Sequence, residues 1–198
     1  KESPVSAISG SILGLLAFLL AFTFGIAADL YAARKALVME EANAIGTAFL
    51  RSDFLPEPDR AEAANLFRKY LDDRVAAVRS GDVGRVREAT ADAARIQGRL
   101  WEMAVANARR DMNSDVAALY IDALNAMFDL HSSRVVLGMH ARIPPDIWRT
   151  LGILVLLGMA GVGYQAAIAG SRRSWTMPIL TASFSLVIAL IASLDRPD

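Results

Sequence analysis

Hydrophobic positions along the chain gather in three uncharged runs, and a long polar stretch separates the first run from the other two. The runs are Val5–Ala28, Thr150–Ser171 and Ser174–Leu194. Each is about 20 residues or longer, the length that a helix needs to cross the roughly 30 Å hydrocarbon core of a bilayer. The polar stretch holds 35 of the 42 charged side chains. This pattern predicts an all-α membrane protein with three visible transmembrane helices and a cytosolic helical bundle between the first and second.

The polar stretch has helical periodicity throughout. The first helix is expected to continue out of the membrane to about Arg51, because Pro56 and Pro58 cannot sit in a helix interior. An i, i+3, i+4, i+7 stripe then predicts a second helix, whose buried face comprises Ala63, Leu66, Phe67, Tyr70, Leu71, Val75 and Val78. The expected divisions are therefore 1–28 (transmembrane, continuous to about 51), 29–145 (bundle) and 146–198 (transmembrane hairpin and short tail).

Two features bear on topology. The chain begins at Lys1 rather than at methionine, which leaves room for a fourth membrane helix upstream. Lys and Arg near the membrane ends favour the cytoplasm. Those on the side of the polar stretch are Arg34, Lys35, Arg142 and Arg149, with Arg196 near the C-terminus; those on the opposite side are Lys1, Arg172 and Arg173. The bias predicts a multi-pass membrane protein with its large domain in the cytoplasm, and the Arg172–Arg173 pair opposes it.

Composition excludes several functional classes. The chain is 54% hydrophobic, which is high for a soluble domain. Its net charge is zero, so no basic surface points to nucleic acid, and the absence of cysteine excludes disulfides and thiolate metal sites. His131 and His140 do not have metal-site spacing, and no phosphate loop, nucleophile elbow or acid–base carboxylate pair is present. We therefore expect no catalytic residue, no metal and no cofactor.

One polar cluster is predicted inside the bundle. Glu40, Glu41 and Asn43 lie on the helix that leaves the membrane, and His131 falls on the apolar stripe of the last polar helix. A buried imidazole needs a hydrogen-bond partner, so we expect His131 to contact the first helix near these residues. A lone histidine on an apolar face is usually a hydrogen-bonded core residue, which makes a structural role the first interpretation.

The first membrane helix carries two rows with a four-residue repeat. Small residues at this spacing let helices approach closely, and they are Ala17, Ala21 and Gly25. Packing within one subunit and packing between subunits both remain open. The second row lies on an adjoining face and comprises Phe18, Phe22 and Ile26. Such a row either faces lipid or lines a pore that is gated by dewetting.

Several segments resemble the bacterial bestrophin-like family of unknown function. They are Leu20–Gly25, Tyr31–Arg34, Glu40–Arg51, Ala123–Asn125, Asp129–Arg134 and Leu194–Pro197, of which Glu-Ala-Asn-Ala-Ile-Gly at 41–46 is the most specific. The resemblance covers nearly the whole chain and extends more distantly to true bestrophins. It implies an oligomeric anion channel, pentameric where known, in which one membrane helix lines the pore and large apolar residues form a neck.

The resemblance would place Phe18 and Phe22 at neck positions. The chain differs from true bestrophins in two ways. It shows three membrane helices rather than four, and it has no counterpart of the eukaryotic acidic calcium clasp. The expected function is passive conduction of inorganic anions by a homo-oligomer in the lipid bilayer, with no enzymatic activity and no nucleic-acid partner. The alternative is a non-conducting membrane sensor or scaffold built on the helical bundle.

Overall fold

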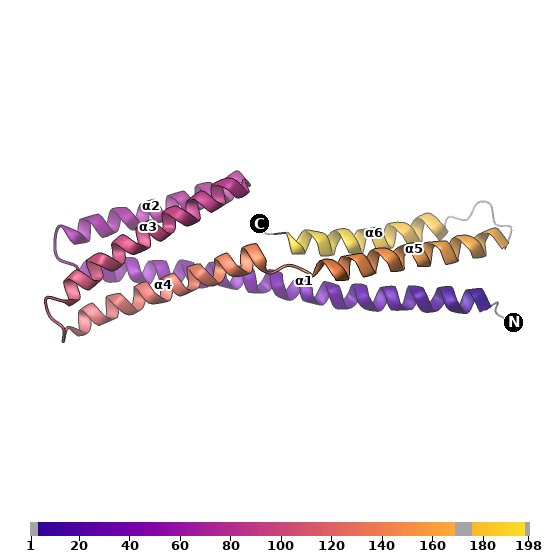
Figure 1. Ribbon diagram of the computed structural model, residues 1–198, viewed down its shortest axis with the longest axis horizontal. Helices are drawn as coiled ribbons and strands as arrows, with labels where there is room; N and C mark the ends of the chain where they lie inside the picture. The colour runs from indigo at the N-terminus through magenta and orange to yellow at the C-terminus, as the bar shows by residue number, and fades with distance from the viewer. Residues whose placement is uncertain (1–3, 169–175, 197–198) are drawn as a thin grey trace. The chain divides into compact units, whose positions relative to one another are not determined.

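The computed structural model describes residues 4–168 and 176–196, and these are helical almost throughout (Figure 1). No strand occurs within these two ranges, so the predicted all-α class is confirmed. A short 3-10 helix, Ser52–Phe54, follows α1 directly. The six α-helices are α1 (Pro4–Arg51), α2 (Asp59–Ser80), α3 (Val83–Ala108), α4 (Asp115–His140), α5 (Pro145–Ile168) and α6 (Thr176–Asp195).

Three of these helices are long and apolar enough to cross a membrane, namely α1, α5 and α6. Their outward surfaces carry large apolar side chains; Leu156 on α5 and Leu186 on α6 are 72% and 73% exposed. Exposed apolar surface of this kind suits contact with lipid. Arg172 and Arg173, which bear on the predicted orientation, lie outside the described residues.

Local chemistry accounts for where the helices begin and end. α1 ends at Arg51, shortly before the Pro56 and Pro58 of the predicted stop. α2 ends at Ser80, and the following residue, Gly81, adopts φ 62°, a left-handed conformation that costs glycine little. Asp82 then caps α3, its side chain accepting a 2.8 Å hydrogen bond from the backbone N–H of Gly84.

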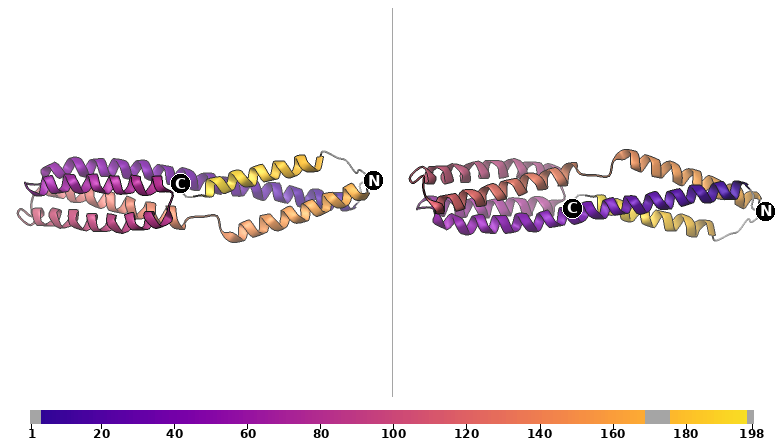
Figure 2. Two further views of the ribbon diagram at one scale, coloured as in Figure 1. Left: turned by 90° about the horizontal axis from the view of Figure 1, so that it is seen from above. Right: turned by 90° about the horizontal axis from the view of Figure 1, so that it is seen from below.

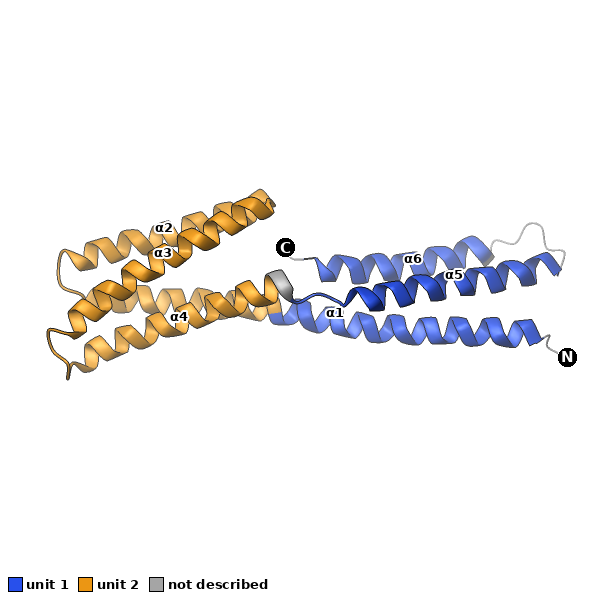
Figure 3. Ribbon diagram, in the orientation of Figure 1, with its two compact units in different colours: residues 1–33, 140–197 blue, residues 34–139, 198 orange. Residues whose placement is uncertain are grey.

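The chain divides into two compact units, coloured separately in Figure 3. The apolar unit comprises Lys1–Ala33 and His140–Pro197, and the polar unit comprises Arg34–Met139. Because α1 spans both ranges, one helix contributes to each unit.

The apolar unit packs α1, α5 and α6 around a small core of aliphatic side chains. Close approach of α5 to α1 depends on glycine, since a Cβ at Gly158 would lie 2.9 Å from Leu13 Cδ2, and one at Gly161 would collide with Ser9. Ile143 near the start of α5 donates its backbone N–H to Asp195 of α6 at 3.0 Å. The core residues are Leu16, Leu20, Ala27, Ile143, Leu151 and Ile191.

The polar unit is a helical bundle formed by the second half of α1 with α2, α3 and α4, which run side by side in both views of Figure 2. The buried positions recur at alternating spacings of four and three, as in a coiled-coil seam. On α2 this row runs through Ala63, Phe67, Tyr70 and Ala77, and on α4 through Ala117, Tyr120, Leu124, Met127 and His131.

This seam corrects one prediction for α2. Leu71, Val75 and Val78 were expected on the buried face, and all three are exposed. The buried row advances from Tyr70 to Ala77 through Arg74, so the charged residue takes the inward position and the aliphatic ones turn outward. Hydrophobicity read from the sequence alone predicts an exposed Arg74 and buried aliphatic neighbours, because burial of a charge is costly unless the charge is paired.

Candidate functional site

Five polar side chains meet inside the polar unit and form what we call the Glu41 cluster. Glu41 comes from α1, Tyr70 and Arg74 come from α2, and His131 and Arg134 come from α4. Glu41 is 1% exposed and His131 is 7% exposed. All five occupy seam positions of their helices, so the cluster forms a polar layer beside the apolar core of the bundle.

Glu41 is the acceptor at the centre of the cluster. Arg74 binds both carboxylate oxygens, with Nη1 2.8 Å from Oε1 and Nη2 3.1 Å from Oε2. Arg134 Nη1 lies 2.6 Å from Oε2. The Tyr70 hydroxyl donates to Oε1 at 3.4 Å, and His131 Nδ1 is 3.5 Å from the same oxygen. One carboxylate thus joins α1 to α2 and α4.

The electrostatics of the cluster keep Glu41 ionised. Burial acts to raise its pKa, but hydrogen bonds with His131 and Arg134 and the charges of Arg74 and Arg134 outweigh burial and lower the pKa to about 2. Burial also raises the pKa of Tyr70, so its phenol keeps its proton and can donate to the carboxylate. Two guanidinium groups and one carboxylate leave the layer with a net positive charge.

The structure brings together two of the four residues that the sequence grouped. Glu41 and His131 are both in the cluster, whereas the side chains of Glu40 and Asn43 are exposed and take no part in it. The reason is helical geometry, since successive residues point about 100° apart and only one of two neighbours can face the core. The inclusion of Glu40 and Asn43 was therefore wrong.

Sequence reasoning missed Tyr70, Arg74 and Arg134 as partners of Glu41. The alternating four-and-three spacing was the signal that could have revealed them, because it places Arg74 and Arg134 on the seams of α2 and α4. A charged residue on a seam calls for an opposite charge on a facing helix. Glu41 is the charged seam residue that α1 supplies.

A second feature lies on α1 within the apolar unit and is called the α1 open face. It comprises Ala17, Phe18, Ala21, Phe22 and Gly25, all of which are exposed. Phe18 and Phe22 are 66% and 62% exposed, and a Cβ added at Gly25 would meet no atom within 4 Å. No other helix of the same chain covers this face among the described residues.

Ile26 does not belong to the α1 open face. It was expected to continue the row of Phe18 and Phe22, but it is half-buried and packs against the core of the apolar unit. Eight residues of α-helix turn the side chain about 80° away from Phe18. The row therefore ends at Phe22 on this face.

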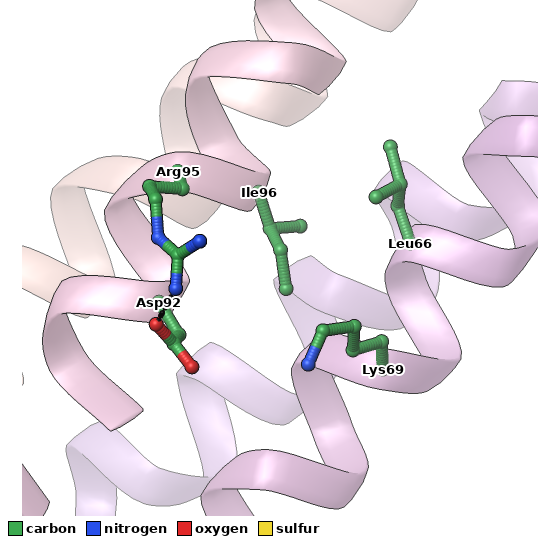
Figure 4. Close-up of a pocket in the computed structure, with 5 residues that line it drawn as sticks. All are labelled: Leu66, Lys69, Asp92, Arg95 and Ile96. Atoms are coloured by element: carbon green, nitrogen blue, oxygen red, sulfur yellow. Dashed lines mark hydrogen bonds and ion pairs between the residues drawn. The ribbon is translucent and has the colours of Figure 1, made fainter. Parts of the chain in front are cut away.

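A shallow pocket of about 220 Å³ lies between α2 and α3 (Figure 4). Leu66, Lys69, Asp92, Arg95 and Ile96 line it. Lys69 is paired with Asp73 at 2.7 Å, and Arg95 is paired with Asp92. Each cation therefore has its own carboxylate, and the pocket offers a ligand no uncompensated charge. Within the described residues, no three His, Asp or Glu side chains lie close enough together to hold a metal ion.

The fold and these two sites define a class of protein, namely an all-α membrane protein in which one helix carries an uncovered apolar face and then enters a polar bundle. The family model for the Bestrophin-like domain matches residues 5–197, and the chain belongs to that family. The resemblance seen in the sequence is thereby confirmed. No curated protein and no solved structure matches the chain.

Proposed function

We propose that identical copies of this chain form a closed ring that conducts ions passively through an axial pore. The observation that carries the proposal is the α1 open face, where Phe18 and Phe22 lie one turn apart and no helix among the residues that the structure describes covers them. In a closed ring, each residue facing the axis is repeated once per subunit. Two stacked phenylalanine rings would then form an apolar neck that gates by dewetting.

Packing between subunits is the role that this proposal assigns to Ala17, Ala21 and Gly25. These small residues have no covering helix among the described parts of their own chain, although their spacing suits close helix contact. A neighbouring subunit would supply the missing surface. The family resemblance suggests a pentamer in the bacterial inner membrane, and the positive residues near Arg34 favour a cytoplasmic polar unit.

The resemblance makes inorganic anions the first permeant ions to test. Phenylalanine edges carry partial positive charge, so a neck of such rings could tolerate an anion that loses part of its hydration shell. Membership of the Bestrophin-like family supports the channel rather than the alternative of a non-conducting sensor or scaffold.

The natural absence of cysteine allows a direct test of the neck. In Phe22→Cys protein reconstituted in liposomes, a water-soluble cationic thiol reagent is expected to change ion flux by about tenfold, because it places charges in the narrowest part of the pore. Mild oxidation is expected to link subunits through the same cysteine. The matched control is Leu186→Cys on α6, whose modification should leave flux unchanged. Equal changes of ion flux in the two variants would contradict the proposed neck. Unchanged flux in Phe22→Cys despite verified labelling would contradict it as well.

Asp29 gives a second prediction, about the ions that enter. It is exposed on α1 within the apolar unit, and seven residues of helix place it about 20° from Phe22. A ring of Asp29 carboxylates would repel anions at the mouth of the neck. A unit charge a few ångströms away is worth about 1 kcal/mol even in water, so Asp29→Asn should raise the anion-to-cation permeability ratio about fivefold.

Reversal potentials across planar bilayers under a salt gradient measure this ratio. Asp72→Asn, which removes an exposed carboxylate from α2, is the control and should leave the reversal potential unchanged. A shift of equal size in both variants would show that Asp29 acts only through net charge and not at the mouth of the pore.

A further inference from the structure

The turn between α2 and α3 lies at the end of the polar unit where α1 enters it (Figure 3). From Phe67 to Arg74 along α2, the contacts on α1 move back from Phe49 to Glu41. The two helices are therefore antiparallel. α2 continues six residues beyond Arg74, so its end is level with about Lys35, which lies six residues before Glu41.

Positive charge is concentrated at this end of the polar unit. Residues 34–35 of α1 and residues 79–88 around the turn contain five cations and two carboxylates. The loops and helix ends at the opposite end, residues 51–60 and 109–115, contain four cations and five carboxylates. The end that carries the α2–α3 turn is therefore positive, and the opposite end is slightly negative.

Three arginines at the turn have no carboxylate partner. Arg79 on α2 and Arg85 and Arg87 on α3 are exposed, and none of them forms an ion pair or hydrogen bond with a residue that the structure describes. Asp82 is engaged as the cap of α3, since it accepts from the backbone N–H of Gly84. Four other exposed cations of the polar unit each contact a carboxylate, namely Arg60, Lys69, Arg95 and Arg99.

The sequence of α1 relates this end of the polar unit to the membrane. The uncharged run of α1 ends at Ala28, and Lys35 lies seven residues, about 10 Å, further along the same unbroken helix. The headgroup layer is roughly 5–7 Å thick on each side of the hydrocarbon core. Surface charges act beyond it over a Debye length of about 8 Å at physiological salt. Arginines at the level of Lys35 are therefore within reach of lipid headgroups.

We propose that the α2–α3 turn binds the anionic headgroups of the bilayer that α1 crosses. A guanidinium group donates two parallel hydrogen bonds to phosphate oxygens, and each cation near an anionic membrane surface strengthens the attraction. Val78 and Val83 lie on either side of the turn and are 51% and 62% exposed, so the turn can approach the interface without burying further charge. The ligand is a phospholipid with net negative charge, such as phosphatidylglycerol.

This contact goes beyond the proposed conduction and does not depend on it. It would attach the α2–α3 hairpin to the membrane independently of the chain connections through α1 and α4. Arg74, which binds Glu41, lies on α2 five residues before Arg79. Anionic lipid at the turn would therefore stabilise the part of α2 that completes the Glu41 cluster.

Energy transfer to labelled lipids tests which headgroups gather at the turn. The full chain carries a donor dye on Val83→Cys, in nanodiscs of phosphatidylcholine and phosphatidylglycerol in equal parts. Acceptor dye is attached to an acyl chain of one lipid or the other, so that the headgroups stay natural. Phosphatidylglycerol should be enriched about fivefold near the donor, the effect of a single cation close to an anionic surface. Equal transfer to the two lipids would overturn the proposal.

Two triple variants in the Val83→Cys chain assign the enrichment. Replacing Arg79, Arg85 and Arg87 by glutamine should abolish it. The control removes the same charge from exposed arginines elsewhere on the polar unit and should leave the enrichment unchanged. Enrichment that survives the loss of the turn arginines, or that falls equally in the control, would overturn the proposal. The control substitutions are Arg68→Gln, Arg109→Gln and Arg110→Gln.

A soluble competitor separates a membrane contact from a site for free phosphate. Glycerol phosphate, added at the overall concentration of phosphatidylglycerol, should not reduce the enrichment, because it lacks the surface on which many lipid charges act together. Loss of the enrichment at this concentration would overturn the proposal and would assign the arginines to a soluble anion.

Hydrogen exchange on the wild-type chain keeps the proposal testable even if the variants do not fold. Backbone amides of residues 79–88 should exchange about fivefold more slowly in nanodiscs with phosphatidylglycerol than in nanodiscs of phosphatidylcholine alone, the effect of one cation held at an anionic surface. Amides of residues 109–115 at the opposite end of the polar unit are the internal reference and should not change. Equal exchange at the turn in the two kinds of nanodisc would show that the contact does not form.

Discussion

Replacing Glu41 by glutamine is expected to destabilise the polar unit by about 3–5 kcal/mol, the usual cost of removing one partner from a buried ion pair. Glutamine keeps the shape of the side chain but loses the charge that Arg74 and Arg134 both bind. These guanidinium groups would remain partly buried without a counter-ion, and the amide could accept from them only weakly.

Denaturant unfolding followed by helical circular dichroism measures this loss. The matched control is Glu40→Gln, the neighbouring exposed carboxylate, which should change stability by no more than about 0.5 kcal/mol. Similar losses in the two variants would contradict the central role of Glu41. A stabilised Glu41→Gln variant would show that the free-energy cost of burying these charges exceeds the stabilisation from their pairing.

The same substitution should remove one pH dependence. The pKa of Glu41 is lowered from 4.5 to about 2 in the folded chain. Its ionisation therefore stabilises the fold fully above about pH 4.5, and this stability is lost as the pH falls toward 2. The free energy of unfolding of Glu41→Gln should therefore depend less on pH between 4.5 and 2 than that of the wild-type protein.

Replacing Phe18 and Phe22 together by alanine is expected to increase anion flux into liposomes. Alanine widens the proposed neck and reduces the apolar surface that water must wet, which lowers the barrier to a hydrated ion. Each 1.4 kcal/mol removed from this barrier raises the flux about tenfold. Both side chains are exposed in the single chain, so the double substitution removes no core contact of the apolar unit.

Leu156→Ala with Leu186→Ala provides the matched control, because these residues are as exposed as the phenylalanines but lie on α5 and α6. This pair should leave the flux unchanged. Unchanged flux in the alanine variant of Phe18 and Phe22, with the oligomer still assembled, would count against the pore. A structure of the assembly with both phenylalanines facing lipid would favour a non-conducting sensor or scaffold.

The sequence by itself determined the elements of this protein. Three uncharged runs predicted the three helices that are long and apolar enough to span a membrane. Pro56 and Pro58 placed the end of α1, and α2 ends at Ser80 before Gly81, a residue type that commonly follows the last residue of a helix. These features are local: hydrophobic length, the missing amide hydrogen of proline and the tolerance of glycine for a left-handed turn act within a few residues.

Only the tertiary structure decided which polar residues meet. The sequence placed Glu41 and His131 on facing helices, but whether Glu40 or Glu41 points inward depends on how α1 rotates against α2 and α4. The rotation of α2 within the bundle likewise buries Arg74 in place of Val75. Hydropathy ranks every charge as a surface residue. A charge becomes a favourable core residue only when a partner more than thirty positions away, such as Arg74 for Glu41, reaches it in three dimensions.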